Sequence, residues 1–319
     1  MRVISKLLLA AGLVCGSWTF AVAADSTVSF GDAAATWSNA CRADVEAHCN
    51  TENPGGGKLA ACLKQYGSPA CNAATAAFGA NLNARIAAEG RAQEICRSDI
   101  SRFCSNFNAG DARILRCMMQ PEHFRAASVP CKNTLAAAGW LDTISIRSSQ
   151  QNPQVADSIE QLSKSVQKVQ VDVTLLHNEL VARIQAEGTA DASASSADLD
   201  ALLQLPNFTV QVDFFLNSDI VKPESWVTVG RIADALHHPL LLGDRFLVVG
   251  HTDSTGTREH NLELSDRRAA AIKQILVTTF KVPAARLIPL GVGEEQLLKG
   301  IPSTDPRNRR VELINLGPS

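Results

Sequence analysis

The last third of the chain alternates strand-like and helix-like patterns of apolar residues, which predicts a sheet covered by helices. Residues 223–237 and 259–279 have helical spacing, and Pro223 stands where a first helical turn tolerates proline. Strand-like apolar segments lie around them at 208–216, 246–249, 287–291 and 310–315. The order β-α-β-α-β-β over residues 205–319 indicates an α+β fold with one sheet and helices on one face.

A different helical pattern occupies residues 153–187, where apolar residues follow one another in alternating steps of four and three. The a positions are Ile159, Val166, Val173 and Leu180, and the d positions are Val155, Leu162, Val169 and Leu176. This heptad pattern favours a coiled coil that forms a parallel homodimer. A single amphipathic helix packed on its own chain is the alternative. Residues 188–204, rich in Ala and Ser, have the composition of a linker.

Residues 1–24 have the parts of a secretory signal peptide: Arg2 and Lys6, an apolar run, and Ala21-Val22-Ala23 before the cleavage point. We therefore expect export to the periplasm. An uncleaved inner-membrane anchor is the alternative, because the apolar run approaches the length of a spanning helix. The mature chain would hold 28 basic and 32 acidic residues, a balance that gives no long-range attraction to nucleic acid.

Eight cysteines remain after the signal peptide, and they form an internal repeat within an expected domain at 38–140. In the units at about 41–75 and 96–135, Cys41, Cys49 and Cys62 recur 55 residues later, and Cys71 recurs 60 residues later. The recurring set is Cys96, Cys104, Cys117 and Cys131. An even number of cysteines in an exported chain predicts four disulfides.

Each unit is expected to form a small helical hairpin, with its turn at Asn53-Pro54-Gly55-Gly56-Gly57 or Asn108-Ala109-Gly110. Four cysteines allow three pairings per unit. An antiparallel hairpin favours joining the inner cysteines to each other and the outer cysteines to each other. The favoured bonds are Cys49–Cys62, Cys41–Cys71, Cys104–Cys117 and Cys96–Cys131.

The Cys-x7-Cys-x12-Cys spacing with Cys-Arg-x-Asp resembles the cysteine-rich repeat of Golgi glycoprotein 1. The resemblance implies a disulfide-braced all-α module without a defined activity. The absence of Cys-x-x-Cys argues against a thioredoxin-type redox role and against a zinc ribbon.

Three ordered motifs lie in the C-terminal third. The first is Gly250-His251-Thr252-Asp253-Ser254-Thr255-Gly256, the second comprises Asn261, Leu264, Ser265, Arg268 and Ala269, and the third is Arg307-Asn308-Arg309-Arg310-Val311-Glu312. Together they resemble the OmpA-like domain family over about residues 208–316. His260 stands where the family often has tyrosine.

This resemblance implies binding of peptidoglycan through the meso-diaminopimelate of its stem peptide. Asp253 and Arg268 match the main ligand contacts of the family. Supporting positions match Asn217, Ser218, Asp219, Thr252, Asn261, Leu264, Asn308 and Arg309. The chemistry agrees, because the ligand's side chain ends in an ammonium and a carboxylate on one carbon. A carboxylate such as Asp253 can hold the first, and a guanidinium such as Arg268 can hold the second with two parallel hydrogen bonds.

The sequence lacks the arrangements of residues that are typical of an enzyme's active site. Ser265 has no His and Asp constellation, and His237, His238 and His251 lack partners at metal-ligand spacing. We therefore expect a non-enzymatic protein without cofactor or metal, located in the periplasm at the cell wall and outer membrane. It would tether peptidoglycan to an unknown envelope protein or glycan bound by the N-terminal domain. The alternatives are a surface adhesin or receptor-like protein whose OmpA-like domain is only the wall anchor, and a component of an inner-membrane complex.

Overall fold

The computed structural model describes residues 28–107, 113–140 and 207–318. The expected signal peptide, coiled coil and linker, and the second hairpin turn at 108–110, lie outside these ranges. No helix within the described ranges has the length and apolar character needed to cross a membrane.

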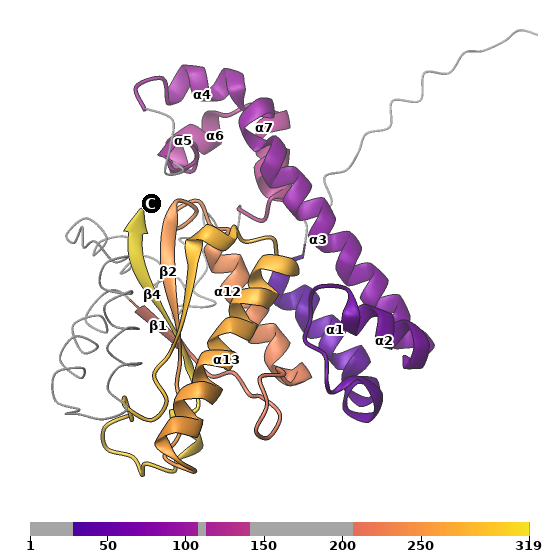
Figure 1. Cartoon of the computed structure of the whole chain (residues 1–319). Helices are drawn as coiled ribbons and strands as arrows, with labels where there is room; N and C mark the ends of the chain where they lie inside the picture. The colour runs from indigo at the N-terminus through magenta and orange to yellow at the C-terminus, as the bar shows by residue number, and fades with distance from the viewer. Residues whose placement is uncertain (1–27, 108–112, 141–206, 319) are drawn as a thin grey trace, which may run out of the picture.

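The C-terminal region forms the expected α+β fold, with a four-stranded sheet in the order β1-β4-β2-β3. The strands are β1 (Asn207–Val210), β2 (Asp244–Gly250), β3 (Leu287–Gly291) and β4 (Val311–Pro318). β2 and β3 are parallel, while β4 runs antiparallel to β1 and β2. Helices α12 (Trp226–Leu236) and α13 (Arg258–Thr278) cover one face of the sheet, which Figure 1 shows. Short 3-10 turns lie at η3 (Pro223–Ser225), η4 (Ala284–Arg286) and η5 (Pro306–Asn308).

The first strand is shorter than the apolar pattern predicted. It ends at Val210, and the chain then forms a hairpin over residues 213–222, in which Phe214 bridges Val221. Asn217 turns this hairpin with a φ of 49°, a left-handed conformation that asparagine tolerates better than most residues. We call residues 213–222 the ligand hairpin, because they carry the expected positions Asn217, Ser218 and Asp219.

The N-terminal region is all-α, as expected, and the four disulfides have the favoured inner-with-inner and outer-with-outer pairing. Its helices are α1 (Phe30–Asp44), continued by the π-helical turn η1 (Val45–Cys49), α2 (Lys58–Tyr66), α3 (Pro69–Ile95), α4 (Arg97–Phe103), α5 (Arg113–Met118), α6 (Pro121–Ala126) and α7 (Val129–Ala137). The units are not two separate hairpins. The 27-residue helix α3 holds Cys71 near its start and ends just before Cys96, so it joins both units.

The aspartate of each Cys-Arg-x-Asp sequence has the same structural role. Asp44 accepts hydrogen bonds from the backbone N–H and hydroxyl of Ser68, and Asp99 accepts the equivalent bonds from Ser128. Ser68 and Ser128 cap the helices that carry the outer cysteines Cys71 and Cys131. The repeated motif therefore fixes the start of those helices.

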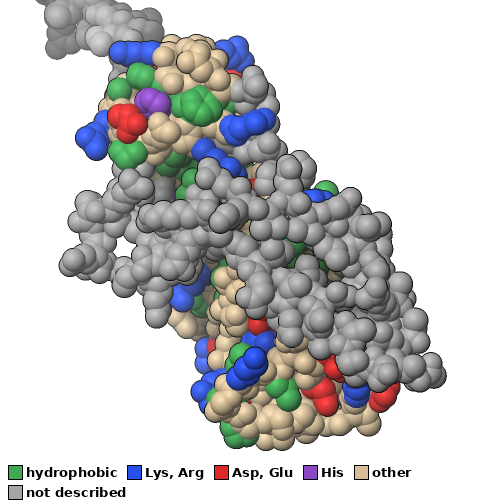
Figure 2. Space-filling view, turned by 90° about the vertical axis from the view of Figure 1, so that its left-hand side faces the viewer, with side chains coloured by type: hydrophobic (Ala, Val, Ile, Leu, Met, Phe, Trp, Pro, Cys, Tyr) green, Lys and Arg blue, Asp and Glu red, His purple; other side chains and the backbone are tan. Residues whose placement is uncertain are grey.

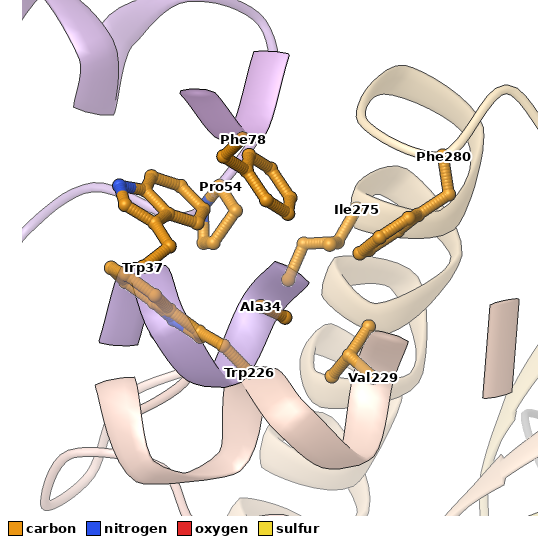
Figure 3. A pocket seen from close by; sticks show the side chains of 8 residues that line it. All are labelled: Ala34, Trp37, Pro54, Phe78, Trp226, Val229, Ile275 and Phe280. Atoms are coloured by element: carbon orange, nitrogen blue, oxygen red, sulfur yellow. The ribbon is translucent and has the colours of Figure 1, made fainter. Parts of the chain in front are cut away.

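The first cysteine-rich unit shares a hydrophobic core with the C-terminal region. Helix α1 crosses α12 on the side away from the sheet, and a Cβ added to Gly230 would lie 2.6 Å from the Phe30 carbonyl oxygen. Trp37 packs between Phe78 and Trp226, with ring centroids 4.5 and 4.3 Å away (Figure 3). The gap among these side chains is only ≈ 10 Å³, and a more open pocket of ≈ 250 Å³ lies beside it, lined by Trp37, Gly55, Phe78 and Thr278 among others.

Buried polar groups fix the same junction. Asp234 of α12 accepts the backbone N–H groups of Phe30 and Gly31 at the start of α1, each at 2.9 Å. It also forms an ion pair with the buried Arg85 of α3, at 2.5 Å. Because an unpaired buried charge is costly, removing Asp234 would leave Arg85 without this partner and weaken the junction.

Candidate functional site

The expected ligand-binding residues gather at one end of the sheet. They lie on the loops that follow β2 and β3, on the ligand hairpin and on the first half of α13, at the lower end of Figure 1. Gly250 and Gly291 end the two parallel strands, and a Cβ on either would collide with the backbone of α13 at Ser265 or Asp266. Glycine at these ends lets α13 lie directly on the strands. In the view of Figure 2, acidic and basic side chains lie side by side at this end.

Asp253 is the buried anion of this site. Only 6% of it is exposed, and its Oδ2 accepts a hydrogen bond from Arg309 Nη1 at 2.6 Å. Its Oδ1 accepts the backbone N–H of Thr255 at 2.9 Å. Desolvation by itself would raise the pKa of Asp253, but the hydrogen bonds from Arg309 and Thr255 outweigh it and lower the pKa below its usual value. Asp253 is therefore a carboxylate at neutral pH.

Arg268 is the buried cation. It is 6% exposed, its Nε donates to the Ser218 carbonyl oxygen at 3.0 Å, and its guanidinium lies 4.8 Å from the centre of the Phe214 ring. Desolvation and the nearby Arg309 lower the pKa of Arg268 to about 10, while Asp253 and Asp219 oppose that shift. It remains charged at pH 7, yet it forms no ion pair with any carboxylate of the described residues.

Other expected residues support these two charges. Asn261 donates from Nδ2 to the Asp253 carbonyl oxygen at 3.2 Å and to Glu294 at 2.5 Å. The fully buried Asn308 holds the loop after β3, since its side chain bonds the backbone of Leu298, Pro302 and Ser303. Arg309 holds Asp253 directly.

Thr252, next to Asp253 in the chain, and Leu264, in the first half of α13, are almost fully buried. The backbone N–H of Thr252 donates to the Gly293 carbonyl oxygen at 2.9 Å. The Thr252 Oγ1 is buried and has no hydrogen-bond partner in the described part of the chain.

The ligand hairpin supplies the remaining positions. Ser218 Oγ accepts the N–H of Ile220 at 2.9 Å, which tightens the turn after Asn217. Asp219 lies close enough to Arg268 to act on its pKa. The exposed Asn217 contributes its backbone conformation to the turn.

Sequence analysis missed three residues at this site. Glu294 follows β3 and bonds Asn261, and Phe214 lies under Arg268, but neither belongs to the three motifs. The third is Asn53 of the first cysteine-rich unit, which bonds the ligand hairpin from 166 residues away in the sequence. No local pattern signals such a long-range contact.

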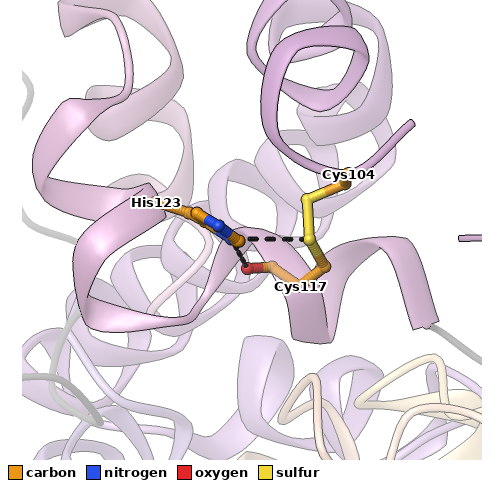
Figure 4. Close-up of side chains that lie close together, drawn as sticks. All are labelled: Cys104, Cys117 and His123. Carbon is orange, nitrogen blue, oxygen red and sulfur yellow. Dashed lines mark hydrogen bonds between the residues drawn. A yellow bond between two sulfur atoms is a disulfide. The ribbon is translucent and has the colours of Figure 1, made fainter. Parts of the chain in front are cut away.

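A second cluster of chemically reactive residue types lies in the second cysteine-rich unit. Cys104, Cys117 and His123 bring their side-chain atoms within 4.8 Å of one another (Figure 4). The two sulfurs form a disulfide with each other, so neither is a thiolate ligand. His123 Nδ1 lies 2.9 Å from the Cys117 carbonyl oxygen, which is a structural contact.

Comparison with known proteins agrees with the geometry of the C-terminal end. The OmpA family model matches residues 214–310. The peptidoglycan-associated lipoprotein of Pseudomonas aeruginosa is 35% identical over 127 residues, which are 40% of this chain and 70% of that protein. Outer membrane porin F of the same species is 30% identical over 126 residues, which are 39% of this chain and 35% of the porin. The chain thus matches about a third of the porin's length.

Among solved structures, the cell wall anchor of the T6SS from Pseudomonas aeruginosa is 26% identical in sequence. The match covers 45% of this chain and 97% of that one, with a TM-score of 0.30.

Proposed function

Because the chain belongs to the OmpA family, we propose that it is a non-enzymatic cell-envelope protein that binds peptidoglycan through meso-diaminopimelate. In this proposal the Asp253 carboxylate accepts hydrogen bonds from the ammonium of the ligand, and Arg268 holds the neighbouring carboxylate. The relatives are named for the outer membrane and for peptidoglycan, which supports a location in the periplasm at the cell wall and outer membrane.

The observation that carries the proposal is the state of Arg268. It is a buried cation with no ion-pair partner among the described residues, and its Nε is already used by Ser218. Its terminal Nη groups can therefore take both oxygens of a carboxylate. A buried cation without a paired anion is costly, so a carboxylate that reaches it gains strongly.

The charge balance of the site supports a zwitterionic ligand. Asp253, Asp219 and Glu294 lie at the same site as Arg268 and Arg309, so the site presents charges of both signs. The Asp253 oxygens accept bonds from Arg309 and Thr255, and a carboxylate has about four lone-pair sites, so it can also accept from an ammonium. A zwitterionic ligand end carries one charge of each sign, so it can pair with both kinds of residue without changing the net charge of the site.

The test uses the full mature chain, because the first cysteine-rich unit shares its core with the C-terminal region. Asp253→Ala and Arg268→Ala should each weaken sedimentation with diaminopimelate-type sacculi by about tenfold to a hundredfold, from the loss of one charged hydrogen-bonding partner. Arg268→Lys should restore binding only in part, because an ammonium lacks the planar two-pronged contact. Arg267→Ala is the matched control, since that neighbouring arginine pairs with the exposed Glu263.

The ligand offers an independent check. Sacculi with lysine in the stem peptide keep the ammonium and lose the carboxylate, so they should sediment little of the protein. Equal binding to lysine-type and diaminopimelate-type sacculi would contradict the role of Arg268. So would an Arg268→Ala variant that sediments like the parent chain.

We further propose that the protein tethers the wall to a partner of its cysteine-rich region. The heptad pattern of residues 153–187 supports a homodimer, and two linked wall-binding sites would gain avidity. Light scattering of the mature chain measures the oligomeric state, and a monomer at tens of micromolar would contradict the dimer.

A further inference from the structure

The first cysteine-rich unit touches the hairpin that carries three of the proposed ligand-binding positions. Asn53, in the turn between η1 and α2, donates from Nδ2 to the Asp219 carbonyl oxygen at 2.9 Å. Its Oδ1 accepts the backbone N–H of Val221 at 2.8 Å. One side-chain amide thus binds the backbone of the hairpin at two alternate residues, as a neighbouring strand would.

Arg268 holds the same stretch of backbone. Its Nε donates to the carbonyl oxygen of Ser218, the residue directly before Asp219. Two successive carbonyl groups are therefore held by two different parts of the molecule, one by the ligand-binding helix α13 and one by the cysteine-rich unit. The placement of Ser218 and Asp219 against Arg268 depends on both bonds.

Asn53 is itself held firmly. The disulfide between Cys49 and Cys62 closes the loop that contains it, with a sequence separation of 13. At the tip of this loop Gly55 has a φ of +110° and packs on the C-terminal end of α13, where an added Cβ would collide with the Thr278 hydroxyl. Only glycine fits this contact. The turn therefore rests on α13 while Asn53 reaches the hairpin.

We propose that Asn53 is a positioning residue for the wall-binding site, that the Cys49–Cys62 disulfide keeps it in place, and that the first cysteine-rich unit thereby sets the affinity of the site for meso-diaminopimelate. The proposal rests on the function proposed above. Without Asn53 the ligand itself would have to order the hairpin, and that cost lowers the affinity. The N-terminal region is then part of the binding machinery as well as a module for a partner.

The first arm of the test measures affinity by calorimetry, with the full mature chain and a soluble stem peptide that ends in meso-diaminopimelate. Asn53→Ala should bind about threefold to tenfold more weakly, from the loss of two net hydrogen bonds. Asn53→Asp should bind no more tightly than Asn53→Ala, because a carboxylate oxygen would face the Asp219 carbonyl oxygen. The matched control is Asn72→Ala, which loses a 2.9 Å bond to the Gly67 carbonyl within the same unit and should bind like the parent.

The second arm uses the two inner disulfides, which have the same sequence separation of 13. Replacing Cys49 and Cys62 with serine should weaken peptide binding, whereas replacing Cys104 and Cys117 should not. Amide hydrogen exchange without ligand provides a readout of positioning. Residues 218–221 should exchange faster in Asn53→Ala and in the first disulfide variant, and at the parental rate in both controls.

The outcomes separate this inference from the proposed function. If Asn53→Ala binds the peptide like the parent while Arg268→Ala loses it, the positioning role of Asn53 is wrong and the wall-binding site stands. If the parent chain itself does not bind the peptide, the proposed function fails and the affinity effect of Asn53 fails with it. Unchanged exchange at residues 218–221 in Asn53→Ala would also overturn the inference.

Discussion

The two cysteine-rich units share a framework but differ in their relation to the rest of the molecule. Both have an inner disulfide of the same span and an aspartate that holds a capping serine. The first unit forms one hydrophobic core with the sheet and its helices, whereas the second has a core cluster of its own. Both units therefore have the same disulfide pairing, while the residues around the disulfides decide what each unit contacts.

One pair of positions illustrates the difference. Trp37 of the first unit packs on Trp226, and the position 55 residues later is Ala92, which is buried inside the second unit's cluster. The second unit contacts the C-terminal region through Leu242, which packs against its cluster, and through polar bonds. Arg116 donates to the Pro239 carbonyl oxygen at 3.1 Å, and the Trp140 indole donates to that of His237 at 2.9 Å. We therefore expect the first unit to open together with the sheet, and the second unit to open more independently.

Removing the outer disulfides should show the largest contrast. The Cys41–Cys71 and Cys96–Cys131 bonds have sequence separations of 30 and 35, so loss of either should cost its unit about 2–4 kcal/mol. Replacing the first pair with serine should also speed amide exchange in β2 and β3, through the shared core. Replacing the second pair should leave exchange in these strands unchanged, and equal acceleration by both would show that the two units are coupled alike.

Replacing Gly230 should disturb the packing of α1 on α12, with a smaller loss of stability than removal of an outer disulfide. In Gly230→Ala the added Cβ meets the Phe30 carbonyl oxygen and the Gly31 Cα, at 2.6 and 2.9 Å, so α1 must shift away from α12. We expect a loss of about 1–3 kcal/mol in the free energy of unfolding, measured by urea denaturation. Gly90→Ala is the control, because its Cβ meets nothing within 4 Å and should stabilise α3 by about 0.5–1 kcal/mol. Equal effects of the two substitutions would refute the close packing of α1 on α12.

Lowering the pH should destabilise the fold at the contact between the second unit and the C-terminal region. This loss of stability should be smaller than those caused by the disulfide and glycine substitutions. Burial, together with the charges of Arg116 and Arg85, lowers the pKa of His238 to about 4. Because the folded pKa lies below the unfolded value of about 6.5, the unfolded chain takes up the proton first. The stability contributed by neutral His238 is fully present above about pH 6.5 and is lost as the pH falls towards 4. About 1–1.5 kcal/mol is lost by pH 5.5.

His238→Asn should flatten this pH dependence, because its Oδ1 can still accept the Leu240 N–H that His238 Nδ1 accepts at 3.1 Å. Chemical denaturation at pH 7.5 and 5.5 measures the difference. His251 titrates in the same direction, since burial and then Arg310 hold its pKa well below the usual value. A His238→Asn variant as acid-sensitive as the parent would contradict the role of His238.

Much of the site could be predicted from sequence because its residues are close in the chain or belong to ordered motifs. Asp253 and Arg268 are fifteen residues apart across one loop and one helix, and the structure places both, buried, at one end of the sheet. The order of strands and helices followed from apolar periodicity, which reports directly on which face of an element is buried. The favoured disulfide pairing followed from the short distance across a turn.

The tertiary structure alone decided which surfaces meet. Asn53 reaches Asp219 and Val221, and Trp37 reaches Trp226, across more than 160 residues of sequence. The end of β1 at Val210 was also decided there, where the chain leaves the sheet and forms the hairpin whose Ser218 carbonyl oxygen bonds Arg268. Periodicity tells which face of a helix is apolar but not what covers it, since docking depends on the shape and polar groups of both surfaces. The sequence therefore determined the elements, the covalent frame and the two charges, and the packing determined that the first cysteine-rich unit contacts the ligand hairpin.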